Sequence, residues 1–369
     1  MKTICFVSLS NLHSVPYIQD YLIAVKNAGM NSHILFWDRI GINNTQNIYS
    51  HFDNITYSPI LDIISPDCSK PAKAMHYKKI IKIIGNILKE KNFECVVFLQ
   101  SHGAVLCYFT IMKYYKEKII IDIRDYFLEK NPFFFFLEKK ILEHSLLRII
   151  SSPAYKKFLP KKQNYVLAHN FHQFPQKQIS RIKDRNRTKV IRISFIGTIR
   201  FFEIDKKFLN VFANDERFQI NYYGVNSELL LNYCKINRIT NVDFFGVFSG
   251  SQIYDFYENT DIINNIYGND TPSLDFALSN KLYHSIQFEL PILVYKNTFM
   301  QQIVEQHDIG FSIDLSEEDI SNKVYNYYNS IDWEQFSQGC NELLRIVEEE
   351  NNIYYNQLHN VFQEIKAHS

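Results

Sequence analysis

Three consecutive residues in the C-terminal half, Ser279, Asn280 and Lys281, have the types and the spacing of an anion site. They follow a polar, turn-rich loop and open a segment, residues 280–288, whose apolar pattern predicts a helix. The first N–H groups of a helix lack partners within it, and the helix dipole favours negative charge at that end. Serine and asparagine are also ordinary N-cap residues, and a lysine in a first turn is often only a solvated charge. Both interpretations stay open at this point.

The elements around these three residues predict how they are held. An apolar run over residues 261–267 predicts a buried strand before the loop, and residues 291–295 predict the next strand after the helix. Strand, loop, helix and strand form one α/β unit, in which the loop leaves the carboxyl end of a strand. This is the arrangement in which α/β proteins bind anions at a helix start.

Polar side chains close two apolar runs in the N-terminal half as well. His102 follows one predicted strand and Asp125 follows the next, so both are expected at the carboxyl edge of a sheet, where ligands gather. A carboxylate or an imidazole at that edge has the chemistry of a general base. His13, in the polar loop after the first predicted strand, is a third candidate. The alternatives are a buried structural histidine at 102 and an ion pair between Arg124 and Asp125.

The second half of the chain repeats this rhythm of apolar runs that end at glycine or at a polar loop. Gly197, Gly224 and Gly246 each follow such a run, and glycine at a strand end lets the backbone approach a ligand closely. With 369 residues, 46% of them apolar, the chain is long enough for two domains. We expect α/β domains with parallel sheets over residues 1–172 and 190–349, joined by a polar linker over 171–189.

Composition excludes several function classes. A net charge of +1 argues against a general nucleic-acid binder.

The N-terminus lacks the pattern of a secretory signal, and no run of about eighteen apolar residues predicts a membrane span, so we expect a cytoplasmic protein. Six scattered cysteines without CxxC spacing indicate reduced thiols. No GxGxxG, P-loop, DxD or His/Cys ligand cluster is found, so neither a cofactor nor a metal ion is expected.

Several stretches resemble GT-B glycosyltransferases, especially family-4-like enzymes of bacterial capsule and surface-polysaccharide synthesis. SNKLYHSIQFELPILVY, which begins at Ser279, resembles the stretch of their C-terminal domain that faces the donor's ribose and phosphates. FIGTIRFFEIDKK resembles their G-x-x-R…K phosphate stretch, and VVFLQSHG and IIIDIRDYFLE resemble two strand ends of their N-terminal domain. The resemblance implies an α/β protein with the GT-B fold, that is, two Rossmann-like domains facing across a cleft. It also implies that the last helix, about residues 350–369, crosses back to the N-terminal domain.

The resemblance also implies roles for residues. The N-terminal domain would bind the acceptor, with Asp125, His102 and His13 as catalytic candidates. The donor candidates include the three strand-end glycines. The full set is Gly197, Arg200, Lys206, Gly224, Gly246, Asp275, Ser279, Asn280, Lys281 and His284. Two glutamates that the family carries eight positions apart fall here on Phe276 and His284, with Asp275 one residue away from the first. Leu128 also stands where the family carries proline.

The function implied is transfer of a sugar from a nucleotide-sugar donor, a UDP-sugar above others, to a glycan or lipid-linked acceptor in surface-polysaccharide synthesis. Two alternatives stay open. A non-hydrolysing nucleotide-sugar epimerase has the same fold, and a non-catalytic nucleotide-sugar-binding subunit would explain the missing glutamates.

Two segments point to a contact surface. From Lys70 to Lys91 the chain carries seven lysines and one glutamate on a helical pattern with one apolar face. This pattern predicts either a surface helix packed on the sheet or a helix that also lies on the anionic inner face of the plasma membrane. Residues 133–136 are four consecutive phenylalanines, which cannot all face one core because they surround a helix.

Overall fold

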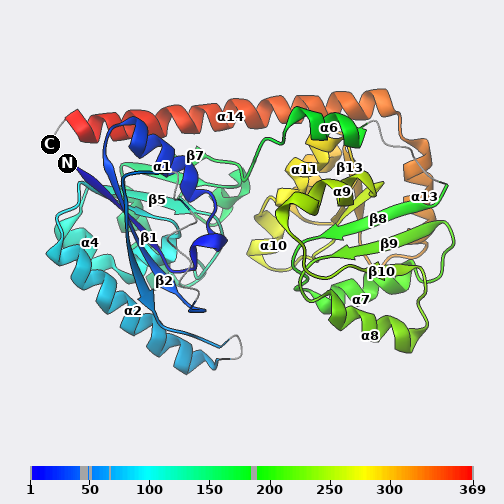
Figure 1. Cartoon of the computed structure of the whole chain (residues 1–369), viewed down its shortest axis with the longest axis horizontal. Coiled ribbons are helices and arrows are strands. Elements are labelled where there is room, and N and C mark those ends of the chain that lie inside the picture. The colour runs from blue at the N-terminus through cyan, green and yellow to red at the C-terminus, as the bar shows by residue number, and fades with distance from the viewer. Residues whose placement is uncertain (1, 42–48, 50–51, 66–67, 184–188, 368–369) are drawn as a thin grey trace. The chain divides into compact units, whose positions relative to one another are not determined.

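The computed structural model describes residues 2–41, 49, 52–65, 68–183 and 189–367, and the chain divides into two compact units (Figure 1). Unit 1 comprises Met1–His169 with Glu349–Ser369, and unit 2 comprises Asn170–Glu348. Each unit has its own parallel β-sheet with helices packed on it, as the repeated apolar rhythm predicts.

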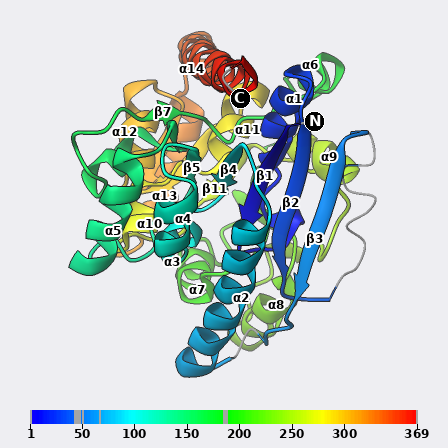
Figure 2. The same cartoon turned by 90° about the vertical axis from the view of Figure 1, so that its left-hand side faces the viewer.

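Unit 1 is built on a seven-stranded sheet in the order β3-β2-β1-β4-β5-β6-β7, in which every pairing is parallel (Figure 2). The strands are β1 (Thr3–Ser8), β2 (Asn31–Asp38), β3 (Ile55–Leu61), β4 (Cys95–Phe98), β5 (Ile119–Ile123), β6 (Leu147–Ile150) and β7 (Val166–Leu167). The central strands β4 and β5 are buried along their whole length, because helices cover both faces of such a sheet.

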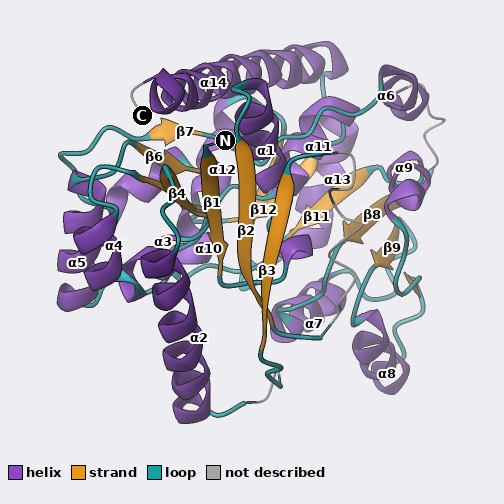
Figure 3. Cartoon of the chain, turned by 60° about the vertical axis from the view of Figure 1, so that its left-hand side comes forward, coloured by secondary structure: helices purple, strands orange, loops and turns teal. Residues whose placement is uncertain are grey.

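The helical elements of unit 1 connect these strands. They are η1 (Leu12–Ser14), α1 (Ile18–Asn27), α2 (Lys70–Glu90), α3 (Ser101–Leu106), α4 (Tyr108–Tyr114), α5 (Pro132–Glu143) and η3 (Pro153–Lys157). Asn131 caps α5 by accepting hydrogen bonds from two backbone N–H groups, and Pro132 occupies the first turn, where it costs no hydrogen bond. α2 contacts α4, and α4 contacts both α3 and α5, so these helices follow one another beside the sheet (Figures 2 and 3).

Unit 2 is built on a six-stranded parallel sheet in the order β10-β9-β8-β11-β12-β13. Its strands are β8 (Ile191–Ile196), β9 (Phe218–Tyr223), β10 (Val242–Phe244), β11 (Ile262–Asn265), β12 (Ile292–Tyr295) and β13 (Gly310–Ile313). Its helical elements are α6 (Gln176–Lys183), α7 (Phe202–Val211), α8 (Ser227–Asn237), η4 (Gly250–Gln252), α9 (Ile253–Glu258), α10 (Pro272–Phe276), α11 (Asn280–Phe288), α12 (Phe299–Gln306) and α13 (Ile320–Ser330).

The last helix, α14 (Trp333–Ala367), belongs to both units (Figure 1). Its first part contributes Phe336, Cys340, Leu343 and Val347 to a core of unit 2. Its second part contributes Tyr354, Leu358 and Phe362 to the core of unit 1. The expected return of the final helix to the N-terminal domain is thereby confirmed.

Two segments differ from the sequence expectations. The expected linker over residues 171–189 contains the helix α6, which packs on α9 and α11 and buries Ile179 and Ile182 in unit 2. The part of that linker at residues 184–188 lies outside the described residues. The strand β3 was not expected, because it contains Pro59 and buries only Ile60, both of which an edge strand tolerates.

The strand orders place a switch point in each sheet. Strand order reverses between β1 and β4 in unit 1 and between β8 and β11 in unit 2. In open parallel sheets, ligands bind at the carboxyl ends of the strands beside such a point, because the flanking connections leave in opposite directions there.

Candidate functional site

The candidate site of unit 2 begins with two glycines at neighbouring strand ends. Gly197 follows β8 with φ of 142°, and Gly224 follows β9 with φ of 140°. A Cβ atom on Gly224 would lie 1.9 Å from the carbonyl oxygen of Gly197, so no larger residue fits there. The Gly197 N–H donates to the carbonyl of Tyr223 at 2.8 Å. The two loops are therefore held in contact, and they present bare backbone at the carboxyl edge of the sheet.

The Lys281 side chain lies against this bare backbone. A Cβ atom on Gly197 would be 3.6 Å from its Nζ. The ammonium is 4.2 Å from the ring centroid of Phe195 and 5.0 Å from that of Tyr267, and it donates to the Tyr267 hydroxyl. Lys281 is only 6% exposed, and among the described residues no carboxylate forms an ion pair with it. An ammonium in such a place is costly unless an anion completes it, so the site is suited to a phosphate.

A buried carboxyl group lies close to this ammonium. Asp205, on the first turn of α7, is buried and accepts a hydrogen bond from the Tyr222 hydroxyl at 3.1 Å. Burial raises the pKa of Asp205 to about 7, while the Tyr222 hydrogen bond and the charge of Lys281 oppose the shift. Near neutral pH this group therefore balances the Lys281 charge only in part.

The start of α11 has the expected cap. Ser279 is the N-cap, and its Oγ accepts a hydrogen bond from the Lys281 N–H at 3.3 Å. Asn280 is exposed on the first turn. The helix has the bounds that the sequence pattern predicts, and its lysine turns inward to Gly197 instead of outward to solvent.

Among the described residues, four other donor candidates form no hydrogen bond or ion pair with Lys281. Lys206 forms an ion pair with Glu203 at 2.7 Å, and Gly246 has no atom within 4 Å of an added Cβ. Arg200 is exposed in the loop after β8. Asp275 accepts a hydrogen bond from the backbone N–H of its own loop at Asp270.

His284 is the donor candidate with the most altered chemistry. Its Nδ1 is 2.5 Å from the Tyr257 hydroxyl, and its ring packs edge-on against Phe174. Burial first, and the nearby charges of Lys281 and His172 second, lower the pKa of His284 to about 3. The imidazole is therefore neutral at any physiological pH.

In unit 1, His102 and Asp125 follow β4 and β5 at the carboxyl edge, as expected from the sequence. His102 stacks on Phe127 with ring centroids 4.4 Å apart. Burial, followed by the charge of Arg39, lowers the pKa of His102 to about 4. The imidazole is therefore neutral and able to accept a proton, although as a weak base. Asp125 and His13 are both exposed.

The Asp-Ile-Arg-Asp segment pairs differently from the ion pair considered between Arg124 and Asp125. Arg124 Nε donates to Asp122 at 2.6 Å, and its Nη2 donates to the second oxygen of the same carboxylate at 2.9 Å. The hydroxyl of Tyr21 also donates to Asp122 at 2.6 Å. Asp122 and Arg124 thus form a buried structural pair that fixes the end of β5, directly before Asp125.

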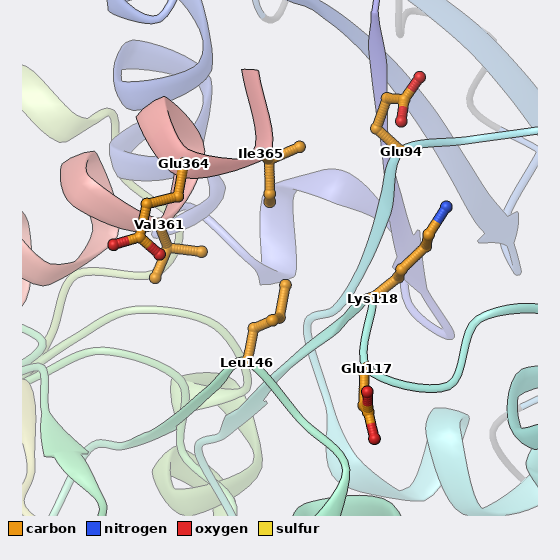
Figure 4. Close-up of a pocket in the computed structure, with 7 residues that line it drawn as sticks. All are labelled: Glu94, Glu117, Lys118, Leu146, Val361, Glu364 and Ile365. Atoms are coloured by element: carbon orange, nitrogen blue, oxygen red, sulfur yellow. The ribbon is translucent and has the colours of Figure 1, made fainter. Parts of the chain in front are cut away.

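One cavity of about 370 Å³ lies at the opposite edge of the unit 1 sheet (Figure 4). Its lining residues immediately precede β4, β5 and β6 or lie on the last turns of α14: Glu94, Glu117, Lys118, Leu146, Val361, Glu364 and Ile365. It therefore belongs to the amino edge of the sheet, away from the strand ends that carry His102 and Asp125.

Across the described ranges, no three histidine, cysteine, aspartate or glutamate side chains are grouped so that they could hold a metal ion. All six cysteines are free thiols. None of the helices in the described part of the chain is long and apolar enough to cross a membrane.

Comparison with solved structures identifies the architecture. Sucrose-phosphate synthase from Thermosynechococcus elongatus superposes with a TM-score of 0.72 at 10% identity over the whole of both chains. HepE from Anabaena, solved in complex with UDP, gives 0.66 at 10% identity over 98% of this chain and 100% of that one. The lipopolysaccharide outer core galactosyltransferase WaaB gives 0.64 at 13% identity over 98% and 99%. The chain has the GT-B fold. At these identities the similarity establishes the fold alone. No protein-family model matches the sequence, and a search of curated protein sequences also gives no match.

Within the GT-B fold, the structure gathers some of the expected donor residues and separates others. Gly197, Gly224 and Lys281 come together. The sequence analysis missed Phe195, Tyr267 and Asp205, which surround the ammonium or lie near it. Phe195 and Tyr267 lie in or beside strands predicted from their apolar runs, so their place at the carboxyl edge was available as a signal. Asp205 carried no such signal.

Proposed function

We propose that the protein is a glycosyltransferase that binds a nucleotide-sugar donor, a UDP-sugar above others, in unit 2. The observation that carries the proposal is the buried Lys281 ammonium beside the bare backbone of Gly197. A nucleoside diphosphate is the leaving group of such a donor, and a fixed cation beside it stabilises the charge that grows as the glycosidic bond breaks. The solved complex of HepE with UDP supports a uridine nucleotide.

We propose Arg200 as a second phosphate ligand. It is exposed in the loop after β8, three residues beyond Gly197, and its guanidinium has the fork geometry that suits a diphosphate. Ser279 and Asn280 complete the donor side at the start of α11, where the helix dipole favours an anion. Lys206 is the weaker candidate, because Glu203 already binds its ammonium.

On the acceptor side, Asp125 is the first candidate for the general base and His102 is the second. Asp125 is exposed to solvent directly after β5, at the carboxyl edge of the sheet. The low pKa of His102 makes it a poorer proton acceptor, so an orienting hydrogen bond to a sugar is the role that suits it better. His13, exposed in η1, is the third candidate.

We further propose that the acceptor is a glycan or a lipid-linked saccharide of surface-polysaccharide synthesis, used at the inner face of the plasma membrane. The similarity to the fold of a lipopolysaccharide galactosyltransferase and the lysines of α2 support this. Transfer is proposed to need no metal ion, because fixed cations and a helix start take the place of one beside the diphosphate.

The test is incubation of the purified chain with UDP-, GDP-, ADP-, dTDP- and CMP-sugars, with nucleotide release and donor identity followed by chromatography. Slow release of a nucleoside diphosphate from a UDP-, GDP-, ADP- or dTDP-sugar, accelerated by a saccharide acceptor, supports transfer, whereas release of CMP from a CMP-sugar alone counts against a diphosphate site. An isomerised nucleotide sugar without release identifies the epimerase. Binding of a nucleotide with neither reaction identifies the non-catalytic subunit, and no binding of any nucleotide overturns the donor site.

A further inference from the structure

Of the four phenylalanines at residues 133–136, some are buried in the structure and others are exposed. Phe134 is buried and packs beside Phe127, whereas Phe133 is 69% exposed and Phe136 is 52% exposed. Spaced three residues apart, the two exposed rings lie on one face of α5, and Lys140 follows four residues later on that face. The exposed face of α5 therefore carries two aromatic rings and Lys140, whose ammonium forms an ion pair with Glu143 at 2.8 Å.

The neighbouring helix α4 continues this pattern. Phe109 is 80% exposed, and Lys113 follows four residues later on the same face. α4 and α5 are in contact, and the ring of Tyr108, at the start of α4, packs edge-on against the ring of Phe109 with centroids 5.4 Å apart. The exposed rings therefore stand on two helices that pack against each other.

The next helix, α2, adds lysines to the edge of that surface. A Cβ atom on Gly85 would lie 3.2 Å from Thr110 Oγ1, which shows how closely α2 approaches α4. Lys82 and Lys89 lie three residues before and four residues after Gly85, hence on the same side of α2, and both are exposed. α2 as a whole carries six lysines and one glutamate.

We propose that Phe109, Phe133 and Phe136, with the lysines that flank them on α2, α4 and α5, dock unit 1 on an anionic lipid bilayer. Aromatic rings enter the headgroup region while lysines meet anionic lipids at its surface. The rings stand on neighbouring helices, which suits a broad, deformable surface. A second copy of the chain would bring lysines against lysines, and like charges at an interface are repelled. This inference extends the proposed use of a lipid-linked acceptor, but its test needs neither donor nor acceptor.

The test is co-sedimentation of the full chain with phosphatidylcholine vesicles and with vesicles containing about 30% phosphatidylglycerol. We expect binding to the anionic vesicles at least tenfold tighter than to the neutral ones. We expect the triple variant Phe109→Ser, Phe133→Ser, Phe136→Ser to bind the anionic vesicles at least tenfold more weakly. Ile236→Ser, which removes an equally exposed apolar side chain from unit 2, is the matched control and should bind as the wild type does. The double variant Lys82→Gln, Lys113→Gln should weaken binding at low salt and flatten its salt dependence.

Three outcomes overturn the proposal: no binding of the wild type to anionic vesicles, equal binding of the triple variant, or a wild-type dimer in sedimentation velocity that the triple variant dissociates. If the triple variant does not fold, Phe109→Ser alone removes the most exposed ring, and the expected loss is about threefold. UDP binding by each variant, measured in parallel, separates failure of this surface from failure of the donor site.

Discussion

The replacement Lys281→Met separates ligand binding from folding, because the two effects are expected to have opposite signs. Methionine keeps an unbranched chain of similar length between the Phe195 and Tyr267 rings but removes the charge. A charge-assisted hydrogen bond to a phosphate contributes about 1.5–3 kcal/mol, so UDP should bind roughly 10- to 150-fold more weakly. The loss should be smaller for ligands without a diphosphate.

The stability of the free protein should change in the other direction. The wild-type ammonium is buried against the Phe195 and Tyr267 rings, and no carboxylate of the described residues forms an ion pair with it. Replacing buried charges by packed apolar groups stabilises by up to about 1–4 kcal/mol. Lys281 also helps Asp205 to ionise, so part of this gain is offset when the cation is lost. We expect a net gain near the lower end of that range, which corresponds to a rise in Tm of about 2–4 °C.

Calorimetric titration with UDP and thermal unfolding with and without UDP measure both effects. Lys235→Met, an exposed lysine on α8, is the control and should change neither. Unchanged UDP affinity in a folded Lys281→Met protein would refute the assignment of the diphosphate to this ammonium. A large loss of stability in the free variant would show instead that Lys281 has a structural partner.

Three further predictions concern the acceptor side, metal ions and pH. Asp125→Asn and His102→Ala should lower turnover by roughly 10²- to 10⁴-fold while UDP affinity changes less than about twofold, and near wild-type turnover in both would place the chemistry elsewhere. Activity should survive EDTA, so complete loss restored by Mn²⁺ or Mg²⁺ would contradict the proposed metal-free transfer. Burial, with Glu129 nearby, raises the pKa of Glu138 to about 8, so the folded chain keeps a proton there that the unfolded chain releases above its usual pKa of 4.5. The free energy of unfolding should therefore fall between about pH 5 and 8 in the wild type, and the advantage of Glu138→Gln should grow over that window by at most about 1.4 kcal/mol per pH unit and level off above it. If the free energy of unfolding changes with pH in the same way in the wild type and in Glu138→Gln, Glu138 does not keep its proton in the folded chain.

The fold was predictable because the apolar runs of both halves end where strands end. The helix predicted over residues 280–288 matches α11 residue for residue, and the apolar runs that end at Gly197 and Gly224 are the strands β8 and β9. The helix α6 was not predictable in the same way. Its sequence is almost wholly polar, and Ile179 and Ile182 become a core contact only when α9 and α11, distant in sequence, come against them.

The site was predictable only where a single local pattern defines it. A lysine near a serine cap marked the start of α11, but no local pattern indicates that its ammonium turns between Phe195 of β8 and Tyr267 in the loop after β11. The pairing of Arg124 with Asp122 follows from a rule that the sequence analysis did not apply. Residues two apart along a strand point to the same side, and Asp122 and Arg124 follow this rule at the end of β5.

The central claim is that unit 2 recognises the diphosphate of a nucleotide sugar through Lys281 and the loops at Gly197 and Gly224. The most direct measurement is a calorimetric comparison of UDP with UMP binding to the wild-type chain, since the two ligands differ only in the β-phosphate. We predict that UDP binds at least tenfold more tightly than UMP, as about 1.4 kcal/mol from one charge-assisted contact requires. Equal affinities for UDP and UMP, or no binding of either, would contradict the account.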